Sequence, residues 1–163
     1  MSWGFRTTCL FALFVRPEIK SAADLRGKRI GVAGFGLLVD RAARLVISKL
    51  GLNPEKDVIF FQTGGEATRL AALVGNSIDA TVLNPPVYKR AVEAGMRVLA
   101  NMEEMGIPFQ NSALVTTQRF IAKNPEVMRR LTKSFVEGIH LIKTNPEVTK
   151  LAIGKYMRMK EPK

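Results

Sequence analysis

Residues 29–40 read RIGVAGFGLLVD and decide the fold class, because a short apolar run ends in glycines and a helical pattern follows them. A strand, a tight turn and a helix in this order are how many nucleotide-binding and other ligand-binding loops begin. Apolar residues recur at helical spacing over 37–50, and Gly51 stands where a helix would end. We therefore expect a strand over 28–33, a glycine loop after it, and a helix over 37–50.

The alternation of strand and helix patterns continues along the chain. The other expected strands are near-continuous apolar runs, as found where helices cover both faces of a largely parallel sheet. They span 10–15, 57–62, 78–83 and 96–100, and the other expected helices span 21–25, 66–74 and 86–94. This order predicts an α/β domain with a mostly parallel sheet.

The C-terminal part of the chain predicts helices after one more strand, which we expect over 111–117. The tripeptide Asn-Pro-Glu occurs at 124–126 and again at 145–147. Asparagine is a preferred N-cap, proline fits the first helical position, and glutamate favours the positive end of the helix dipole. We therefore expect a long helix to about Lys143 and a final helix after Asn145.

The composition is that of a globular chain with a basic surface. The 163 residues are 47% hydrophobic, and 25 Lys and Arg against 14 Asp and Glu give a formal net charge of +11. The basic residues are scattered and only 7% of residues are aromatic, so nucleic-acid binding is not indicated. The single cysteine, Cys9, and the single histidine, His140, exclude an internal disulfide, a cysteine metal cluster and a multi-histidine zinc site. We expect no metal, no cofactor and no catalytic residue.

The N-terminal stretch MSWGFRTTCLFALFVRP superficially resembles a signal peptide. Its apolar run, CLFALFV, has only seven residues, and Arg16-Pro17 follows it in place of a small-x-small cleavage site. The run is also too short to span a bilayer. We expect a buried strand that Pro17 ends, and no export signal in this stretch.

The glycine loop fits neither nucleotide-binding pattern. In the dinucleotide pattern G-x-G-x-x-G, Val39 would occupy the third glycine, where its side chain would hold the helix and the strand apart. The second expected strand ends in Gln62-Thr63, with no acidic residue to bind a ribose hydroxyl. The P-loop pattern also fails, because no Lys-Ser or Lys-Thr pair follows the glycines.

Three loops leave the carboxyl ends of the expected parallel strands, which is where ligands bind in such sheets. They span 34–40, 63–65 and 84–86, and each precedes the first turn of an expected helix. Helix N-termini offer unpaired N–H groups and the positive end of the dipole, so the three loops together suit an anion or a strongly polar ligand. Each loop taken singly is better explained as a tight turn between strand and helix.

Longer segments of the sequence match one family in order. They are VRPEIKSAADLRGKRIGV (15–32), KLGLNPEKDVIFFQTGG (49–65), ATRLAAL (67–73) with GNSIDATVLNPP (75–86), and AGMRVLANMEEMGIPFQNSALVTTQRFIAKNPEVMRRL (94–131). From about Leu10 to its end, the chain resembles the sulfonate, taurine, nitrate and thiamine-precursor type of substrate-binding protein of ABC importers. The resemblance implies an α/β fold of the periplasmic-binding-protein-like class II, in which two lobes close on a ligand.

The resemblance also implies how the chain divides. Residues 1–20 would form a remnant strand of the first lobe and the first crossing between lobes, and residues 21–112 the second, α/β lobe. Residues 113–163 would form the return crossing and C-terminal helices that pack on the first lobe. Proteins of this family are considerably longer, so the chain resembles a fragment, a truncated reading frame or a protein that a partner completes.

The resemblance places the candidate ligand contacts in the three loops. They are Gly34, Phe35, Gly36, Leu38, Asp40, Thr63, Gly64, Gly65 and Asn84. Backbone N–H groups of the first loop would face the ligand, and residues 63–65 would form a second contact suited to an anion. Leu37 and Leu38 stand where the family commonly has small hydroxyl residues, which favours a more apolar ligand.

Three polar residues near these loops have alternative roles. Asp40 would be a polar contact of the ligand or a complement to the helix dipole, and we favour the second role. Asn84 would bind the ligand through its amide or cap the turn before Pro85. Asp79 is expected to fix the start of its strand and not to touch the ligand.

The function that the resemblance implies is capture of a small anionic or heteroaromatic solute by lobe closure, without bond chemistry. The ligand would be a sulfonate, nitrate or a pyrimidine precursor, the partner an ABC importer permease, and the location the periplasm. Association with a partner or with a second copy would cover a missing first lobe. Two alternatives stay open: a truncated remnant that does not bind by itself, and an enzyme of thiamine-pyrimidine synthesis on the same fold.

Overall fold

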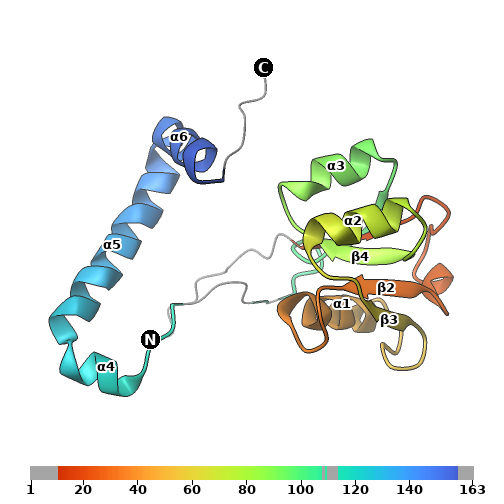
Figure 1. Cartoon of the computed structure of the whole chain (residues 1–163), viewed down its shortest axis with the longest axis horizontal. Coiled ribbons are helices and arrows are strands. Elements are labelled where there is room, and N and C mark those ends of the chain that lie inside the picture. Colours follow the sequence, from red (N-terminus) through yellow and green to blue (C-terminus); the bar gives the residue numbers. More distant parts are fainter. Residues whose placement is uncertain (1–10, 108, 110–113, 158–163) are drawn as a thin grey trace. The chain divides into compact units, whose positions relative to one another are not determined.

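The computed structural model describes residues 11–107, 109 and 114–157 of the chain, which divides into two compact units (Figure 1). The first unit spans residues 1–113 and contains the sheet with the helices that cover it. The second unit spans residues 114–163, and its described part consists of helices.

A five-stranded sheet with the order β3-β2-β4-β1-β5 forms the centre of the described first unit. Its strands are β1 (Ala12–Val15), β2 (Arg29–Val32), β3 (Ile59–Gln62), β4 (Ala80–Leu83) and β5 (Arg97–Asn101). β2 pairs with β3 and β4 in parallel, whereas β1 pairs with β4 and β5 in antiparallel. Four strands therefore run in one direction and β1 runs against them, which confirms the expected mostly parallel sheet.

Strand β1 corrects one part of the expected division of the chain. The expectation assigns residues 1–20 to a first lobe, but β1 lies between β4 and β5 in the sheet of the α/β unit. All four residues of β1 are buried. The run is apolar at every position, so it needs burial on both faces, and an inner strand of a covered sheet provides this.

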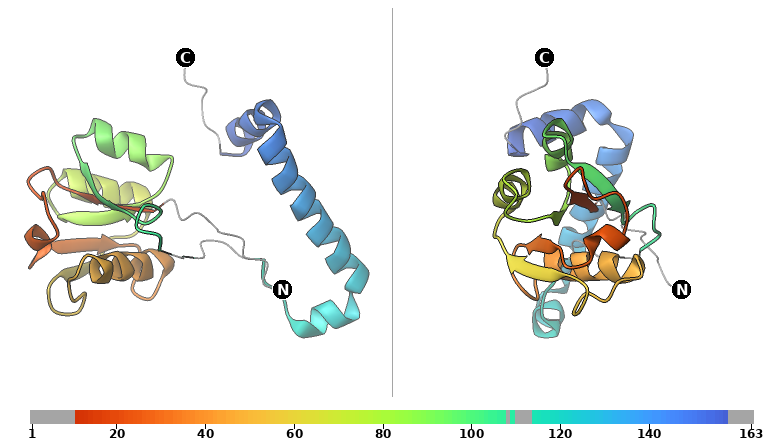
Figure 2. Two further views of the ribbon diagram at one scale, coloured as in Figure 1. Left: turned by 180° about the vertical axis from the view of Figure 1, so that it is seen from behind. Right: turned by 90° about the vertical axis from the view of Figure 1, so that its right-hand side faces the viewer.

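Helices cover both faces of the sheet, so the first unit has three layers (Figures 1 and 2). Helix α1 (Leu38–Lys49) covers one face, and α2 (Glu66–Val74) with α3 (Val87–Glu93) covers the other. Alternate residues of β1 point to opposite layers: Leu13 packs in the α1 layer, whereas Phe14 packs with α2 and α3. A short 3-10 helix, η1 (Ala23–Leu25), precedes β2.

The described part of the second unit consists of α4 (Gln118–Lys123), α5 (Pro125–Thr144) and α6 (Pro146–Met157). The strand expected over 111–117 is not formed by residues 114–117, and residues 111–113 lie outside the described residues. The Thr117 hydroxyl instead accepts the N–H of Phe120 at 3.1 Å and caps α4. The Thr117 cap therefore begins a helix where the sequence predicts the end of a strand.

The two Asn-Pro-Glu motifs differ in how their asparagines act. Asn145 Oδ1 accepts the N–H of Val148 at 3.1 Å, so the expected cap of α6 is confirmed. At the start of α5, the Asn124 side chain donates to the carbonyl of Phe120 at 3.1 Å and caps no N–H. The side-chain cap expected there is wrong. Helix α4 ends directly before α5, and a carbonyl of its last turn accepts the hydrogen bond of the asparagine amide.

Helix α5 is amphipathic, and no residue of α4 or α5 is buried. Large apolar side chains recur along α5 every three or four residues and so share one side of it. This α5 apolar face consists of Val127, Leu131, Phe135, Ile139 and Ile142, each at least 38% exposed. Within the described residues, the second unit therefore has no core that covers this face.

Candidate functional site

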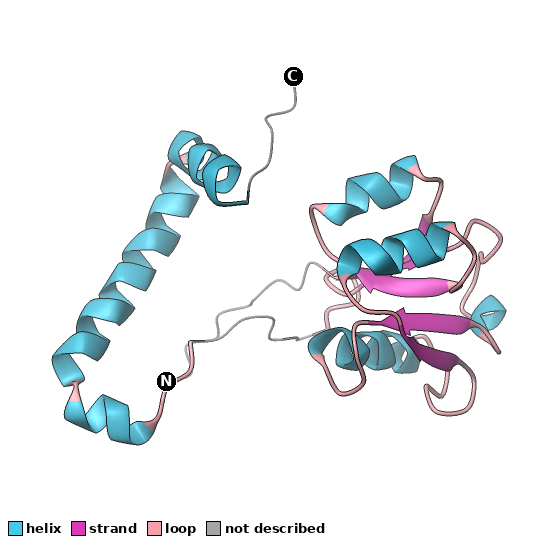
Figure 3. Cartoon of the chain, viewed as in Figure 1, coloured by secondary structure: helices cyan, strands magenta, loops and turns pink. Residues whose placement is uncertain are grey.

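Three loops follow the carboxyl ends of β2, β3 and β4, and because these strands are parallel the loops share one edge of the sheet (Figure 3). We name them the glycine loop (33–37), the Thr63 loop (63–65) and the Asn84 loop (84–86). A Cβ atom built on Gly34 would lie 3.8 Å from Nε2 of Gln62, the last residue of β3. The structure therefore brings together the three segments in which the sequence places its candidate ligand contacts.

The glycine loop is closed by its own hydrogen bonds. The N–H of Leu37 donates to the carbonyl of Gly34 at 3.2 Å, and the N–H of Gly36 donates to Asp40 Oδ2 at 2.8 Å. Gly36 has φ of +75°, a left-handed conformation that favours glycine. Asp40 thus accepts the Gly36 N–H within the protein, and Gly36 as a ligand contact stays a prediction.

Asp40 fixes the glycine loop to α1. The residue is 4% exposed, and Oδ1 accepts Arg44 Nε at 2.9 Å while Oδ2 accepts the N–H of Gly36. Arg44 also pairs with Glu55 and lies over the Phe60 ring, with 4.2 Å from its guanidinium carbon to the ring centroid. Both carboxylate oxygens are therefore engaged within the protein, which favours a structural role for Asp40.

The side chains of the glycine loop present apolar surface. Phe35 is 57% exposed, Leu37 is 56% exposed and Leu38 is 38% exposed. These residues follow a strand that is itself buried, so their exposure belongs to the loop. Any ligand at this edge would meet apolar side chains beside the backbone groups of the loops.

The Thr63 loop is held from both sides. The N–H of Thr63 donates to the carbonyl of Val32 at 2.8 Å, which extends the β2–β3 pairing by one residue. The carbonyl of Gly64 accepts Arg69 Nη1 at 2.8 Å, and Gly64 has φ of +90°. Apart from the adjacent residues of the chain, no described protein atom lies within 4 Å of a Cβ built on Gly64 or Gly65. The outer side of this loop is open to a ligand.

The Asn84 loop is bound to the first turn of α2. The backbone N–H of Asn84 donates to Glu66 Oε1 at 2.8 Å, and its side-chain amide, with the nitrogen turned to the carboxylate, donates to Oε2 at 2.8 Å. The N–H of Val87 donates to the carbonyl of Asn84, not to its side chain. The Asn84 amide thus caps nothing before Pro85, and it binds Glu66.

Arg69 connects the loop edge to the sheet. It is 4% exposed, and besides Gly64 it donates to Thr81 Oγ1 at 3.2 Å and to the carbonyl of Val82 at 3.4 Å. The Thr81 hydroxyl in turn donates to the carbonyl of Gly31 at 2.8 Å. Burial lowers the pKa of Arg69, and the nearby charge of Glu66 acts in the opposite direction.

Glu66 and Arg69 are absent from the residues that the sequence proposes for the site. A signal for Arg69 exists, because it lies on the same side of α2 as the buried Leu70 and Leu73. An arginine on the apolar side of a short helix needs buried acceptors, and the nearby strand and loop carbonyls supply them. Glu66 gave no comparable signal, since a glutamate in a first helical turn is explained by the helix dipole alone.

Asp79 lies at the opposite end of the strands from the three loops, since it directly precedes β4. Its Oδ2 accepts the backbone N–H and Nε of Arg29, each at 2.9 Å, and its Oδ1 accepts Arg29 Nη2 at 2.9 Å and Arg16 Nη1 at 3.3 Å. The Arg29 guanidinium is the main reason that the pKa of Asp79 falls to about 2. The expected role of Asp79 at the start of its strand is confirmed.

The described part of the chain contains neither a candidate metal cluster nor a helix suited to a membrane crossing. No group of three or more His, Cys, Asp or Glu side chains there could hold a metal ion, and Cys9 lies outside the described residues. None of the described helices combines the length and the apolar composition that a membrane crossing requires.

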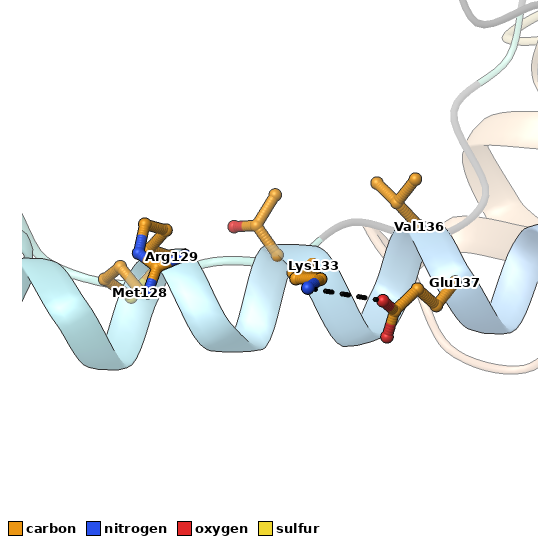
Figure 4. Close-up of a pocket in the computed structure, with 6 residues that line it drawn as sticks. Met128, Arg129, Lys133, Val136 and Glu137 are labelled. Atoms are coloured by element: carbon orange, nitrogen blue, oxygen red, sulfur yellow. Dashed lines mark ion pairs between the residues drawn. The ribbon is translucent and has the colours of Figure 1, made fainter.

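A shallow hollow runs along α5 (Figure 4). Its lining residues are Met128, Arg129, Thr132, Lys133, Val136 and Glu137, and Lys133 pairs with Glu137 at 3.7 Å. All six residues come from one helix, so the hollow has a single wall. Ligand sites enclose most of a small molecule, which this surface cannot do.

Curated relatives of the chain are named as binding proteins. A Brucella abortus protein named as a binding protein is 28% identical over 150 residues, which cover 90% of this chain and 46% of the relative. A Brachyspira hyodysenteriae protein named as a periplasmic binding protein of an ABC transporter is 29% identical over 133 residues, covering 81% and 37%. The chain therefore spans less than half the length of these curated relatives.

Solved structures share the fold. The periplasmic aliphatic sulphonate binding protein SsuA from Escherichia coli matches 93% of this chain and 51% of its own, with a TM-score of 0.74 and 20% identity. The desulfurization enzyme DSZB matches 88% of this chain and 56% of its own, with a TM-score of 0.65 and 18% identity. These matches confirm the periplasmic-binding-protein-like fold that the sequence predicts.

A family model described as NMT1/THI5 like matches residues 6–149, which is most of the chain. The match includes the sheet, the three loops of the candidate site and all of α4 and α5. The resemblance stated from the sequence segments is thereby confirmed, and this chain belongs to the NMT1/THI5-like family.

Proposed function

We propose that this chain provides the α/β lobe and the C-terminal helices of a solute-binding protein that serves an ABC importer. The observation that carries the proposal is the meeting of three loops, each leading into a helix, at one edge of the sheet. Ligands of open α/β sheets bind at this edge. The relatives named as binding proteins and the sulphonate binding protein of the same fold support the proposal.

The proposed ligand is a small anionic or heteroaromatic solute, such as a sulfonate, nitrate or a pyrimidine. Backbone N–H groups of Gly64, of Gly65 and of the first turn of α1 would bind its polar group, since in the described residues they meet no protein acceptor. The exposed Phe35 and Leu38 would contact its apolar part. Asn84 would contribute its amide only by leaving Glu66.

Capture would occur by closure of this lobe against a first lobe. The α5 apolar face is exposed within the described residues, and a first lobe packed on α4–α6 would cover it. Such a protein would act in the periplasm and deliver its ligand to an importer permease. The step involves no bond chemistry, and the three loops contain no histidine or cysteine that an enzyme on this fold would use.

The test measures ligand binding by the full chain. Thermal shift and titration calorimetry are carried out with ethanesulfonate, nitrate and cytosine. At least one of these solutes is expected to raise the melting temperature and to bind with one site per chain. Failure of all three to bind would contradict independent capture and favour the alternative of a remnant that needs a first lobe.

A matched pair of glycine variants locates the site. Gly64 and Gly27 both have positive φ, and both have open space around a built Cβ. Gly64→Ala and Gly27→Ala should each lower stability by roughly 1 kcal/mol. Only Gly64→Ala is expected to weaken binding of the solute that wild type binds, because Gly27 lies before β2, away from the loops. Equal affinities of the two variants would exclude the Thr63 loop from the site.

A further inference from the structure

The guanidinium of Arg69 is held by uncharged acceptors. It lies beside Gly64, Thr81 and Val82, and in the described part of the chain no carboxylate lies within ion-pair distance of it. A buried cation of this kind requires that each acceptor stay in place, because an N–H group without a partner is costly away from water. The shortest of its contacts, 2.8 Å, is to the carbonyl of Gly64 in the candidate site.

This contact fixes the direction of the next N–H group. The peptide between Gly64 and Gly65 is trans, and in a planar trans peptide the C=O and N–H bonds point in opposite directions. With the Gly64 oxygen turned inward to the guanidinium, the Gly65 N–H points outward. In the described residues it has no acceptor, and the space around both glycines is open.

We propose that Arg69 is a positioning residue of the ligand site, which holds the Gly64–Gly65 peptide so that the Gly65 N–H donates to the bound solute. The proposal rests on the proposed function and names one donor of that site and the residue that orients it. Without the guanidinium, the peptide between two glycines is free to rotate, and an outward Gly64 carbonyl would repel an anionic or acceptor group. Arg69 would thus act on the ligand through the backbone and without touching it.

Glu66 fixes the neighbouring Asn84 loop through a hydrogen bond in a similar way. It lies one turn before Arg69 on α2 and holds the backbone N–H of Asn84 at 2.8 Å. The first turn of α2 therefore holds both the Thr63 loop and the Asn84 loop. A displacement of α2 would move both loops together.

The first experiment is a titration of the full chain with ethanesulfonate, in which NMR spectra monitor the backbone amide signals. In wild type the Gly65 amide should be among the signals that shift. Arg69→Met should bind roughly tenfold or more weakly, and Arg69→Lys, which keeps the charge and a single donor nitrogen, should have an affinity between those of wild type and Arg69→Met. The control is Arg26→Met, which removes an exposed arginine paired with Asp57 and should leave affinity unchanged. A bound ligand that leaves the Gly65 amide unshifted, or full affinity in Arg69→Met, would overturn the proposal.

The second experiment needs no ligand and separates this proposal from the proposed function. The residual dipolar coupling of the Gly65 N–H bond reports the orientation of the peptide, and it should differ between wild type and Arg69→Met. If Arg69→Met does not fold, Thr81→Val removes one acceptor of Arg69 and should produce a smaller change of the same sign. In wild type itself, the Gly65 amide should exchange with solvent nearly as fast as in an unfolded peptide. An unchanged coupling or a slowly exchanging Gly65 amide would contradict the orientation even if ethanesulfonate binds, whereas no binding with the expected coupling would contradict only the proposed function.

Discussion

Asp79 determines how the stability of the sheet depends on pH. Hydrogen bonds from Arg29 hold its pKa at about 2, below the ordinary value of 3.8. The unfolded chain therefore takes up a proton at higher pH than the folded chain, so this contribution is complete above about pH 4 and is lost as the pH falls toward 2. We expect about 2 kcal/mol of unfolding free energy to disappear over that range, measured by urea denaturation at a series of pH values.

The variant Asp79→Asn should lack this dependence. It should lose roughly the same 2 kcal/mol at neutral pH and show a flatter curve below about pH 4. Glu93→Gln serves as the control, since Glu93 is 61% exposed and forms only a 3.9 Å surface pair with Lys89. An Asp79→Asn curve parallel to that of wild type would assign the acid sensitivity to other carboxylates.

Asp40 illustrates a carboxylate whose loss should affect the glycine loop directly. Asp40→Asn keeps the size of the side chain but removes the charge that faces Arg44 and one acceptor for the Gly36 N–H. We expect a loss of about 2 kcal/mol in unfolding free energy, because the carboxylate is buried and bound twice. Chemical denaturation measures the loss, and hydrogen exchange at Gly36 should accelerate. Unchanged exchange there would show that the loop keeps its form without the carboxylate.

At the scale of single elements, the sequence predicted what depends on local pattern. Apolar runs and glycine turns gave the strands and helices of the α/β unit to within a few residues, because pattern and burial agree there. The pairing of β1 with β4 and β5 was missed, because four apolar residues in a row predict a buried strand but not the neighbours with which it pairs. The contacts of Asn84 and Arg69 were missed for a related reason: their partners are 18 and 12 residues away along the chain.

The α5 apolar face is exposed in the described part of the second unit, so it should bind apolar molecules from solution. The full chain should bind the dye ANS, and Leu131→Lys together with Ile142→Lys should remove roughly half of that fluorescence. The control is the double variant Lys133→Ala with Glu137→Ala, which changes an ion pair of α5 outside the α5 apolar face. Undiminished fluorescence in the lysine variant would show that the dye binds elsewhere, for example at the exposed side chains of the glycine loop.

At the scale of the whole molecule, the two units differ in the interactions that can stabilise each of them separately. The first unit buries side chains on both faces of its sheet, whereas no described residue from 114 to 156 is buried. A hydrophobic core is the main source of folding free energy, and isolated helices of this length are marginal in water. The α/β unit should therefore be able to fold by itself, and the helical unit should need a partner surface.

This difference predicts the behaviour of the separated units. A fragment of residues 1–113 should unfold in one cooperative transition, with a melting temperature within about 5 °C of the full chain. A fragment of residues 114–163 should show partial helicity by circular dichroism and a gradual loss on heating without a sigmoidal transition. A melting temperature of the first fragment far below that of the full chain would mean that the helices contribute to its core. A cooperative transition in the second fragment would mean that α4–α6 cover their own apolar faces, which would remove the reason to assign those faces to a first lobe.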